Sequence, residues 1–471
     1  MRSPSLSRRH LLASGAALAL LGAARPGLAQ EGGAPAPAGD AELASRIAAV
    51  AEPLPAITDP DFARFIDRYA GARVVLMGEE THGTDDFYRA RAAMTERLVR
   101  EHGFTVVAVE ADWPDAARID GHLRGHDPLA SSDTPFPRFP AWMWRNRPVE
   151  DLIGRLRAFN EEVGDPARQA SFHGLDLYSL PSSMDAVEEF AQRHDPAALE
   201  EIRTRYGCLA PWADDPQTYG ALARSSPHDT CAADVSSVAT DVLGRRLGEV
   251  ETADPRVFDA FMNARVVAAS EAYYRAMYEG GAASWNLRDT HFFETLLHVL
   301  KARGDGAKAV VWAHNSHIGD ARATGMSERG EINIGQLARE HFGEEAVLIG
   351  FGTDRGTVTA ATEWNAPPQV MEVNPSLDGS WGALMREVGP ERFFLDLRAL
   401  DPELAEALSQ GRIERFIGVL YLRETELWSH YVEAALGRQF DGYVWLEETR
   451  AVEWLTQEEL EALPPTHPFA S

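Results

Sequence analysis

Short apolar runs alternate along the chain with longer amphipathic segments, and this alternation predicts the fold class. The run RVVLM at 73–77 is followed by a helical pattern from about 85 to 101 and then by FTVVAVE at 104–110. Further apolar runs lie at 170–176, 308–315, 346–352, 393–397, 418–422 and 442–448. Strands that are apolar throughout and separated by helices are typical of a largely parallel sheet covered on both faces. We therefore predict a three-layer α/β/α fold with a largely parallel central sheet of roughly six to eight strands.

The region from about 113 to 305 differs from the rest of the chain, because helical patterns dominate it. The longest pattern, PRVFDAFMNARVVAASEAYYRAMY, begins at residue 255. We expect this region to be a large, mainly helical insertion over the sheet. No internal repeat or heptad array divides the chain, so residues 43–471 are predicted to form one domain.

The first 29 residues have the pattern of a signal peptide. A basic start is followed by the apolar segment LLASGAALALLGAA and by small residues before Gln30. The Arg8-Arg9 pair suits the twin-arginine export route, and a plain Sec signal or an uncleaved anchor is the alternative. Residues 30–42, rich in Gly, Ala and Pro, are predicted to be a flexible linker. We expect a bacterial periplasmic or secreted protein without a stable membrane anchor after cleavage, because no later stretch is apolar for roughly 18 residues.

Charge and cysteine content narrow the possible partners. The chain has 45 basic and 72 acidic residues, a net charge of -27, which disfavours nucleic acid and anionic membranes as partners. Cys208 and Cys231 are the two cysteines of the chain, and an oxidising compartment would permit them to pair. Two free thiols are the alternative, because sequence does not show how close the Cα atoms come. The oligomeric state stays open.

Ionisable side chains follow three of the predicted strands at the point where each strand ends. They are Glu79, Glu80 and His82 after the first strand, Glu110 and Asp112 after the second, and His314 and His317 in the segment WAHNSH after the run at 308–315. The carboxyl ends of parallel strands meet at one edge of a sheet, so we expect these groups to lie together. A single residue of this kind is more often structural, but three such endings predict a functional site.

An arginine on the following helical pattern points to the same place. Arg91 shares one helical stripe with Phe87, Met94 and Leu98, and is therefore expected to face the sheet. A buried arginine needs a carboxylate partner, for which Glu79 and Glu110 are the candidates. The pair could belong to the site or could tie helix to strand.

Two mechanisms fit a cluster of glutamates, histidines and an arginine. In the first, a histidine held by a carboxylate deprotonates a water molecule that attacks an ester carbonyl. In the second, the histidines and a carboxylate hold a divalent metal such as zinc, which activates the water. The motifs G-x-S-x-G, H-E-x-x-H and the Walker A loop are all missing from the sequence.

The chain resembles the erythromycin esterase family in several segments. They include LMGEETHGTDDFYRARAAMTERLVREHGFTVVAVEADW, RFPAWMWRNRPVEDLIGRLRAFN, SFHGLDLYS, SWNLRDTHF and VVWAHNSHIGD, and the similarity runs from about residue 45 to 455. The resemblance implies an α/β fold with helical additions and a hydrolase that opens a macrolide lactone with activated water and no cofactor, and so confers antibiotic resistance. The WMWRN and FHGLDLYS segments look typical of a broad, uncharacterised branch, so other lactones and esters, including acylated envelope saccharides, also remain candidate substrates.

By resemblance, each candidate residue takes a role. His82 corresponds to the general base, and Glu79 to the glutamate that orients it. Glu110 corresponds to a second acidic position and Arg91 to the arginine of the intervening helix. His314 and His317 match a histidine pair that assists proton transfer or binds the oxyanion. A metal-dependent hydrolase and a non-catalytic periplasmic ligand-binding protein are the alternative functions.

Overall fold

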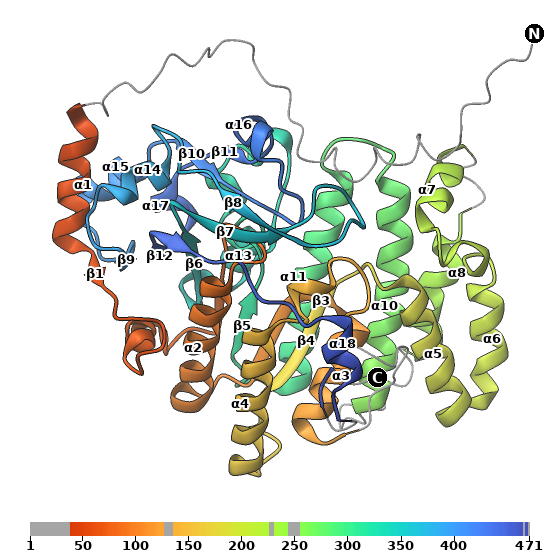
Figure 1. The fold of residues 1–471 in the computed structure, drawn as a ribbon. Coiled ribbons are helices and arrows are strands. Elements are labelled where there is room, and N and C mark those ends of the chain that lie inside the picture. Colours follow the sequence, from red (N-terminus) through yellow and green to blue (C-terminus); the bar gives the residue numbers. More distant parts are fainter. Residues whose placement is uncertain (1–37, 127–134, 226–229, 244–254, 465–466, 470–471) are drawn as a thin grey trace, which may run out of the picture.

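The central sheet has eight strands in the order β1-β9-β12-β6-β2-β5-β3-β4 (Figure 1). The computed structural model describes residues 38–126, 135–225, 230–243, 255–464 and 467–469. The strands are β1 (Glu52–Pro53), β2 (Val74–Met77), β3 (Val106–Asp112), β4 (Ser171–Asp176), β5 (Ala309–Trp312), β6 (Ala346–Gly352), β9 (Arg392–Asp396) and β12 (Gly442–Leu446). The six strands from β12 to β4 run parallel, whereas β9 is antiparallel to both β12 and β1. The predicted α/β class and the largely parallel sheet are confirmed.

Side chains alternate between the two faces of the sheet, and each face has its own core. Val75 and Met77 of β2 belong to one core, and Val74 and Leu76 belong to the other. The first core includes residues of α2 (Asp85–His102), α3 (Trp113–Arg124) and α4 (Arg147–Val163). The second includes residues of α1 (Ala38–Val50), α10 (Pro255–Ala276), α11 (Ala283–Arg303), α13 (Ile334–Phe342), α14 (Trp381–Arg386), α15 (Pro402–Leu408) and α17 (Leu436–Gln439). Burial on both faces explains why these strands are apolar throughout.

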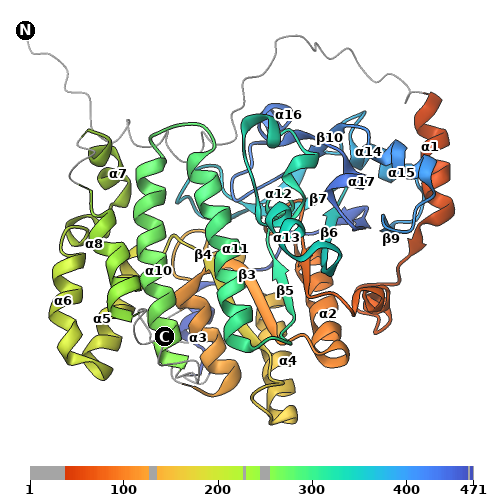
Figure 2. The same ribbon diagram turned by 180° about the vertical axis from the view of Figure 1, so that it is seen from behind.

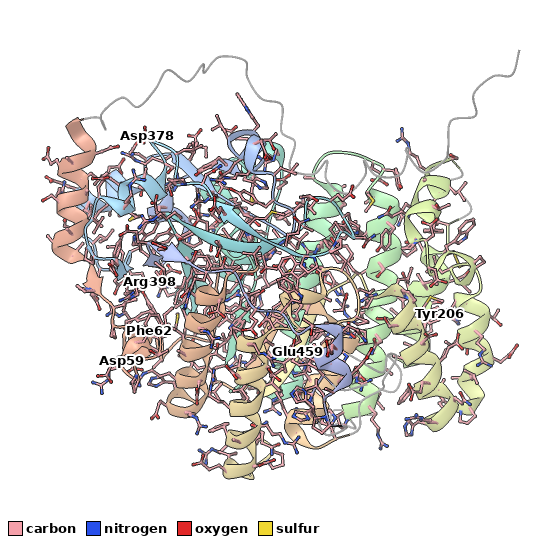
Figure 3. The ribbon with its side chains drawn as sticks, viewed as in Figure 1. Asp59, Phe62, Tyr206, Asp378, Arg398 and Glu459 are labelled. Carbon is pink, nitrogen blue, oxygen red and sulfur yellow. A yellow bond between two sulfur atoms is a disulfide. The ribbon has the colours of Figure 1, made fainter. Side chains whose placement is uncertain are left out.

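A separate helical lobe lies beyond β4. It contains α5 (Leu180–His194), α6 (Pro196–Tyr206), α7 (Pro216–Ser225) and α8 (Ala232–Ser237), and α10 lies between these helices and the sheet in both views (Figures 1 and 2). On α10, Met262 and Val266 pack on the sheet, whereas Ala260 and Val267 pack in the lobe. In Figure 3, Phe62 of the first sheet core and Tyr206 of the lobe core lie far apart. The span 113–305 is therefore mainly helical, but it also contributes strand β4 to the sheet.

Two small sheets lie outside the central one, and they correct one predicted strand. β7 (Arg355–Ala360), β8 (Gln369–Val373) and β13 (Glu448–Thr449) form one, and β10 (Arg412–Arg415) pairs with β11 (Tyr431–Ala434) in the other. The predicted strand at 418–422 is wrong, because this segment has only an isolated bridge between Leu420 and Ala361. Its apolar residues serve different clusters: Val419 packs on the first sheet core and Tyr421 beneath β7 and β8.

The expected signal peptide lies outside the described residues. Helix α1 already begins at Ala38, inside the segment expected to be a linker to residue 42. None of the described helices is long and apolar enough to span a bilayer. The short helices α12 (Asn315–Ile318), α16 (Glu426–Ser429) and α18 (Gln457–Glu461) complete the elements used below.

Cys208 and Cys231 form a disulfide in the helical lobe, with their Cα atoms 5.8 Å apart. Replacing both residues by serine should lower the free energy of unfolding of the lobe by about 3 kcal/mol, because the bond closes a loop of 23 residues. Urea unfolding followed by circular dichroism would measure the change, with the reduced native chain as the matched comparison. Equal midpoints for the oxidised and reduced chains would contradict the prediction.

Candidate active site

The six predicted site residues come together at the carboxyl edge of three neighbouring strands. β5 lies between β2 and β3 in the sheet, so the segments that follow these strands converge. The residues are Glu79, His82, Arg91, Glu110, His314 and His317, and each is at most 7% exposed. Buried ionisable groups need partners, and the contacts form two networks.

Two glycines allow the chain to turn closely around the first network. A Cβ atom on Gly78 would lie 2.0 Å from Asn315 Oδ1, and Asn315 N donates to Glu79 O at 2.9 Å. Gly83 has φ +67°, and a Cβ atom there would lie 2.1 Å from Thr359 O. Close backbone approach therefore requires a glycine on each side of Glu79 and His82.

The first network is a chain from Arg91 through Glu79 to His82. Arg91 Nη2 donates to Glu79 Oε2 at 2.6 Å, and His82 Nδ1 donates to Glu79 Oε1 at 2.7 Å. Because a carboxylate only accepts, the hydrogen of neutral His82 is on Nδ1 and the lone pair is on Nε2. The Arg91 guanidinium also lies over the rings of Tyr88 and Trp312, at 4.8 and 4.7 Å. This arrangement orients His82 to accept a proton at Nε2.

His314 is held by backbone groups and by the Ser316 hydroxyl, which lies 2.8 Å from Nδ1, rather than by a carboxylate. Its Nε2 donates to Glu80 O at 3.0 Å, and its Nδ1 accepts from Ser316 N at 3.2 Å as the cap of α12. The ring centroid lies 4.8 Å from that of His82. Burial, together with the nearby His82, holds the pKa of His314 well below its usual range. His314 is therefore a neutral ring that fixes the loop beside His82.

The second network surrounds His317. Its Nδ1 donates to Asp289 Oδ2 at 2.9 Å, and its Nε2 lies 3.3 Å from Glu110 Oε1. Arg288 Nη2 donates to the same Glu110 oxygen at 2.8 Å and to Asp176 Oδ2 at 2.5 Å. Glu110 Oε2 accepts from His314 N at 3.0 Å. Burial raises the pKa of Glu110, but His317 and Arg288 outweigh that effect and hold it well below the usual range, so Glu110 is an anion.

Sequence reasoning missed three members of this network, although two carry signals. Asp176 ends strand β4, so the rule that selected Glu110 applies to it as well. Asp289 lies on the buried stripe of α11 with Phe292 and Leu296, which is the type of signal that selected Arg91. Arg288 carries no such signal, because its role depends on contacts with β3 and β4.

The neighbouring acids Glu80 and Asp112 have other partners. Glu80 Oε2 accepts from Thr353 N at 2.7 Å, and Glu80 Oε1 lies 3.5 Å from Arg415 Nε. Burial raises the pKa of Glu80 to about 7. Asp112 forms an ion pair with Arg138, and burial raises its pKa. In the part of the chain that the structure describes, neither Glu80 nor Asp112 forms a hydrogen bond with the ring of His82, whose carboxylate partner is Glu79.

A segment at 416–419, called the cover below, lies over His82. Ile417 N donates to Glu80 O and His82 N donates to Ile417 O, both at 2.9 Å. The ring of Phe416 meets His314 edge to face with centroids 5.5 Å apart. Surface cavities of about 420 Å³ and 310 Å³ lie elsewhere, the first beside α2 and α4 and the second beside α18. The cluster is therefore largely buried, since His82 itself is 5% exposed.

The donor set does not fit a metal ion. Within the described parts of the chain, no three His, Cys, Asp or Glu side chains are arranged to hold one. Both ring nitrogens of His314 and of His317 already have protein partners. We therefore derive no step through a metal.

The ion pair between Arg91 and Glu79 leads to a prediction about stability. Arg91→Leu should lower the free energy of unfolding by about 3–5 kcal/mol, because it leaves a buried carboxylate without its cation. Arg97→Leu on the same helix is the matched control, since its ion pair with Asp67 is at the surface and should matter by about 1 kcal/mol or less. Chemical denaturation would measure both changes. Equal losses in the two variants would contradict a special role for Arg91.

Comparisons with known proteins agree with the residue pattern. The family model for erythromycin esterase matches residues 99–449, a range that contains Glu110, His314 and His317 and begins after Arg91. A putative hydrolase, YbfO of Bacillus subtilis, is 22% identical over 394 residues, which cover 80% of this chain and 84% of that protein. Erythromycin esterase type II of Escherichia coli is 20% identical over 404 residues, covering 81% and 90%.

Solved structures share the fold at low identity. A protein from Bacillus cereus has a TM-score of 0.74 at 18% identity, covering 89% of this chain and all of that one. A succinoglycan biosynthesis protein has a TM-score of 0.72 at 20% identity, covering 88% and 98%. An erythromycin esterase mutant in its open conformation has a TM-score of 0.61 at 15% identity, covering 85% and 98%. With its family model matched over most of its length, the chain belongs to the erythromycin esterase family.

Proposed function

We propose that this protein hydrolyses a carboxylic ester or lactone with a water molecule activated by His82. The observation that carries the proposal is the buried chain from Arg91 through Glu79 to His82, which leaves Nε2 of the base free to take a proton. Family membership supports a hydrolase-like activity, and the geometry supplies a base for it.

The reaction needs one proton removed and one returned. His82 Nε2 takes a proton from water, whose oxygen attacks the carbonyl carbon, and Glu79 stabilises the imidazolium that forms. Glu110 is an anion whose charge interacts with that imidazolium, so it lowers the free energy of the same state. The ester bond then breaks, and the leaving oxygen takes the proton back from the His82 imidazolium, which returns the base to its starting state.

Two substrate classes have support from relatives. Erythromycin esterase type II supports a macrolide lactone, and thereby antibiotic resistance. The succinoglycan biosynthesis protein supports an acylated saccharide, which matches the periplasmic or secreted location that we propose from the N-terminal segment. A binding protein without activity would have no need of a base held by a carboxylate.

Replacing His82 by alanine should reduce ester hydrolysis by about 10²- to 10⁴-fold, because the general base is lost. The purified mature chain would be incubated with macrolides, aryl esters and acylated oligosaccharides, and the products followed by mass spectrometry. The matched control is His102→Ala, a histidine near the end of α2 that pairs with Asp67.

Each outcome of this panel decides a claim. Hydrolysis by the native chain and by His102→Ala, with loss in His82→Ala, would support the proposal and identify the substrate class. Equal hydrolysis by the His82→Ala variant would remove His82 from the mechanism. Tight binding without turnover across the panel would favour the binding protein.

A further inference from the structure

Helix α11 places two oppositely charged residues behind His317. Asp289 is fully buried and accepts from His317 Nδ1 at 2.9 Å and from Ile334 N at 3.0 Å. Arg288 donates to Glu110 at 2.8 Å and to Asp176 at 2.5 Å. The ring of Trp285 stacks on that of His317, with the ring centroids 4.5 Å apart and an angle of 4° between the planes. Both ring nitrogens of His317 therefore have partners: Nδ1 contacts Asp289, and Nε2 lies near Glu110 and Arg288.

The two histidine networks differ in their balance of charge. In the first, the guanidinium of Arg91 offsets the single carboxylate of Glu79. In the second, the carboxylates of Asp289, Glu110 and Asp176 face the one guanidinium of Arg288, which leaves two negative charges unbalanced. Unbalanced buried charge is costly, and a proton on His317 reduces it.

We propose that Asp289 and Arg288 are positioning residues: Asp289 holds His317 as a cation against Glu110, and Arg288 binds Glu110 and Asp176, so that Glu110 stays fixed and ionised opposite the base His82. The catalytic meaning of this inference rests on the proposed function, whereas the charge state of His317 does not. Neither residue needs to touch the substrate, because both act through His317 and Glu110.

The polar groups that face His317 are Asp289 and Arg288 from α11, Glu110 from β3 and His314 from its own loop. The two carboxylates favour the charged form of His317, whereas the positive charge of Arg288 opposes it. Burial lowers the pKa of His317, but Asp289 and Glu110 more than offset that effect and raise it to about 9. Burial also raises the pKa of Asp289, yet Ile334 N donates to the same carboxylate and favours its ionised form. We therefore place the shared proton on the ring of His317.

One contact of Arg288 is favourable only when His317 is neutral. Arg288 Nη1 lies 3.0 Å from His317 Nε2, a contact that is favourable only when this nitrogen carries a lone pair. When Nε2 is protonated it donates to Glu110 instead, and Arg288 keeps its bonds to Glu110 and Asp176. The network therefore tolerates both states of His317, and the carboxylates decide which one prevails.

The first test is the titration of His317 itself. In the native chain labelled in its histidines, with the His317 signal assigned by a His317→Gln variant, NMR should show a ring that remains protonated at pH 8. A neutral ring at pH 7 would overturn the inference. This measurement needs no substrate, so it stands even if no ester is hydrolysed and the proposed function fails.

The second test removes the charge of Asp289. Asp289→Asn should lower the pKa of His317 by about 1 to 3 units, because an amide offers no negative charge. Where hydrolysis is measurable, the alkaline limb of the pH-rate profile should move to lower pH by the same amount, since Glu110 loses its cation when His317 deprotonates. An unchanged titration in a folded Asp289→Asn variant would contradict the role of Asp289.

A matched control separates positioning from general destabilisation. Asp120→Asn removes another buried carboxylate that contacts a histidine, His126 at 2.9 Å, and that accepts from Phe172 N in β4. It should lower stability without moving the titration of His317 or the alkaline limb. Arg288→Lys keeps the positive charge but loses the paired contacts with Asp176, and should reduce kcat more than it changes KM.

Discussion

The site depends on the rule that a charge can be buried only beside a partner. A carboxylate near the surface could orient a histidine alone, but Glu79 is covered by the chain around it and needs Arg91 on its other oxygen. The position of α2 also matters, because this helix presents Arg91 toward the aromatic rings of Tyr88 and Trp312 inside the fold. The geometry of the site and the packing of α2 on the sheet are therefore parts of one arrangement.

The strand order brings the two networks, one around His82 and one around His317, to the same edge of the sheet. His82 follows β2 and Glu110 lies near the end of β3, while the segment after β5, the strand between them, supplies both His314 and His317. His314 N donates to Glu110 and the His314 ring lies beside His82, so this loop connects the two networks. The helical lobe contributes none of the six site residues. Helix α10 packs both on the sheet and on the lobe, and so joins the two.

The sequence predicted the parts of this molecule that follow from periodicity and from strand ends. Arg91 was identifiable because it interrupts an apolar stripe, and Glu110 because parallel strands end at one edge. The segment at 418–422 was misassigned because an apolar run shows burial but not the neighbour that buries it. Arg288 could not be found for a related reason: its partners on β3 and β4 are more than 100 residues away along the chain, and no local pattern records such contacts.

Closure over the base constrains how a substrate could reach it. The cover at 416–419 follows Arg415, which is buried and donates to Thr353 O at 2.6 Å and to Glu426 at 3.2 Å. The cover itself is joined to the strand end by two backbone hydrogen bonds of Ile417, and Phe416 N donates to His430 O at 2.6 Å. Phe416 and Ile417 are also buried, so displacing the cover would expose apolar side chains as well as break these hydrogen bonds. The two charged networks therefore lie beneath a packed segment, and low local polarity strengthens the interactions between their charges.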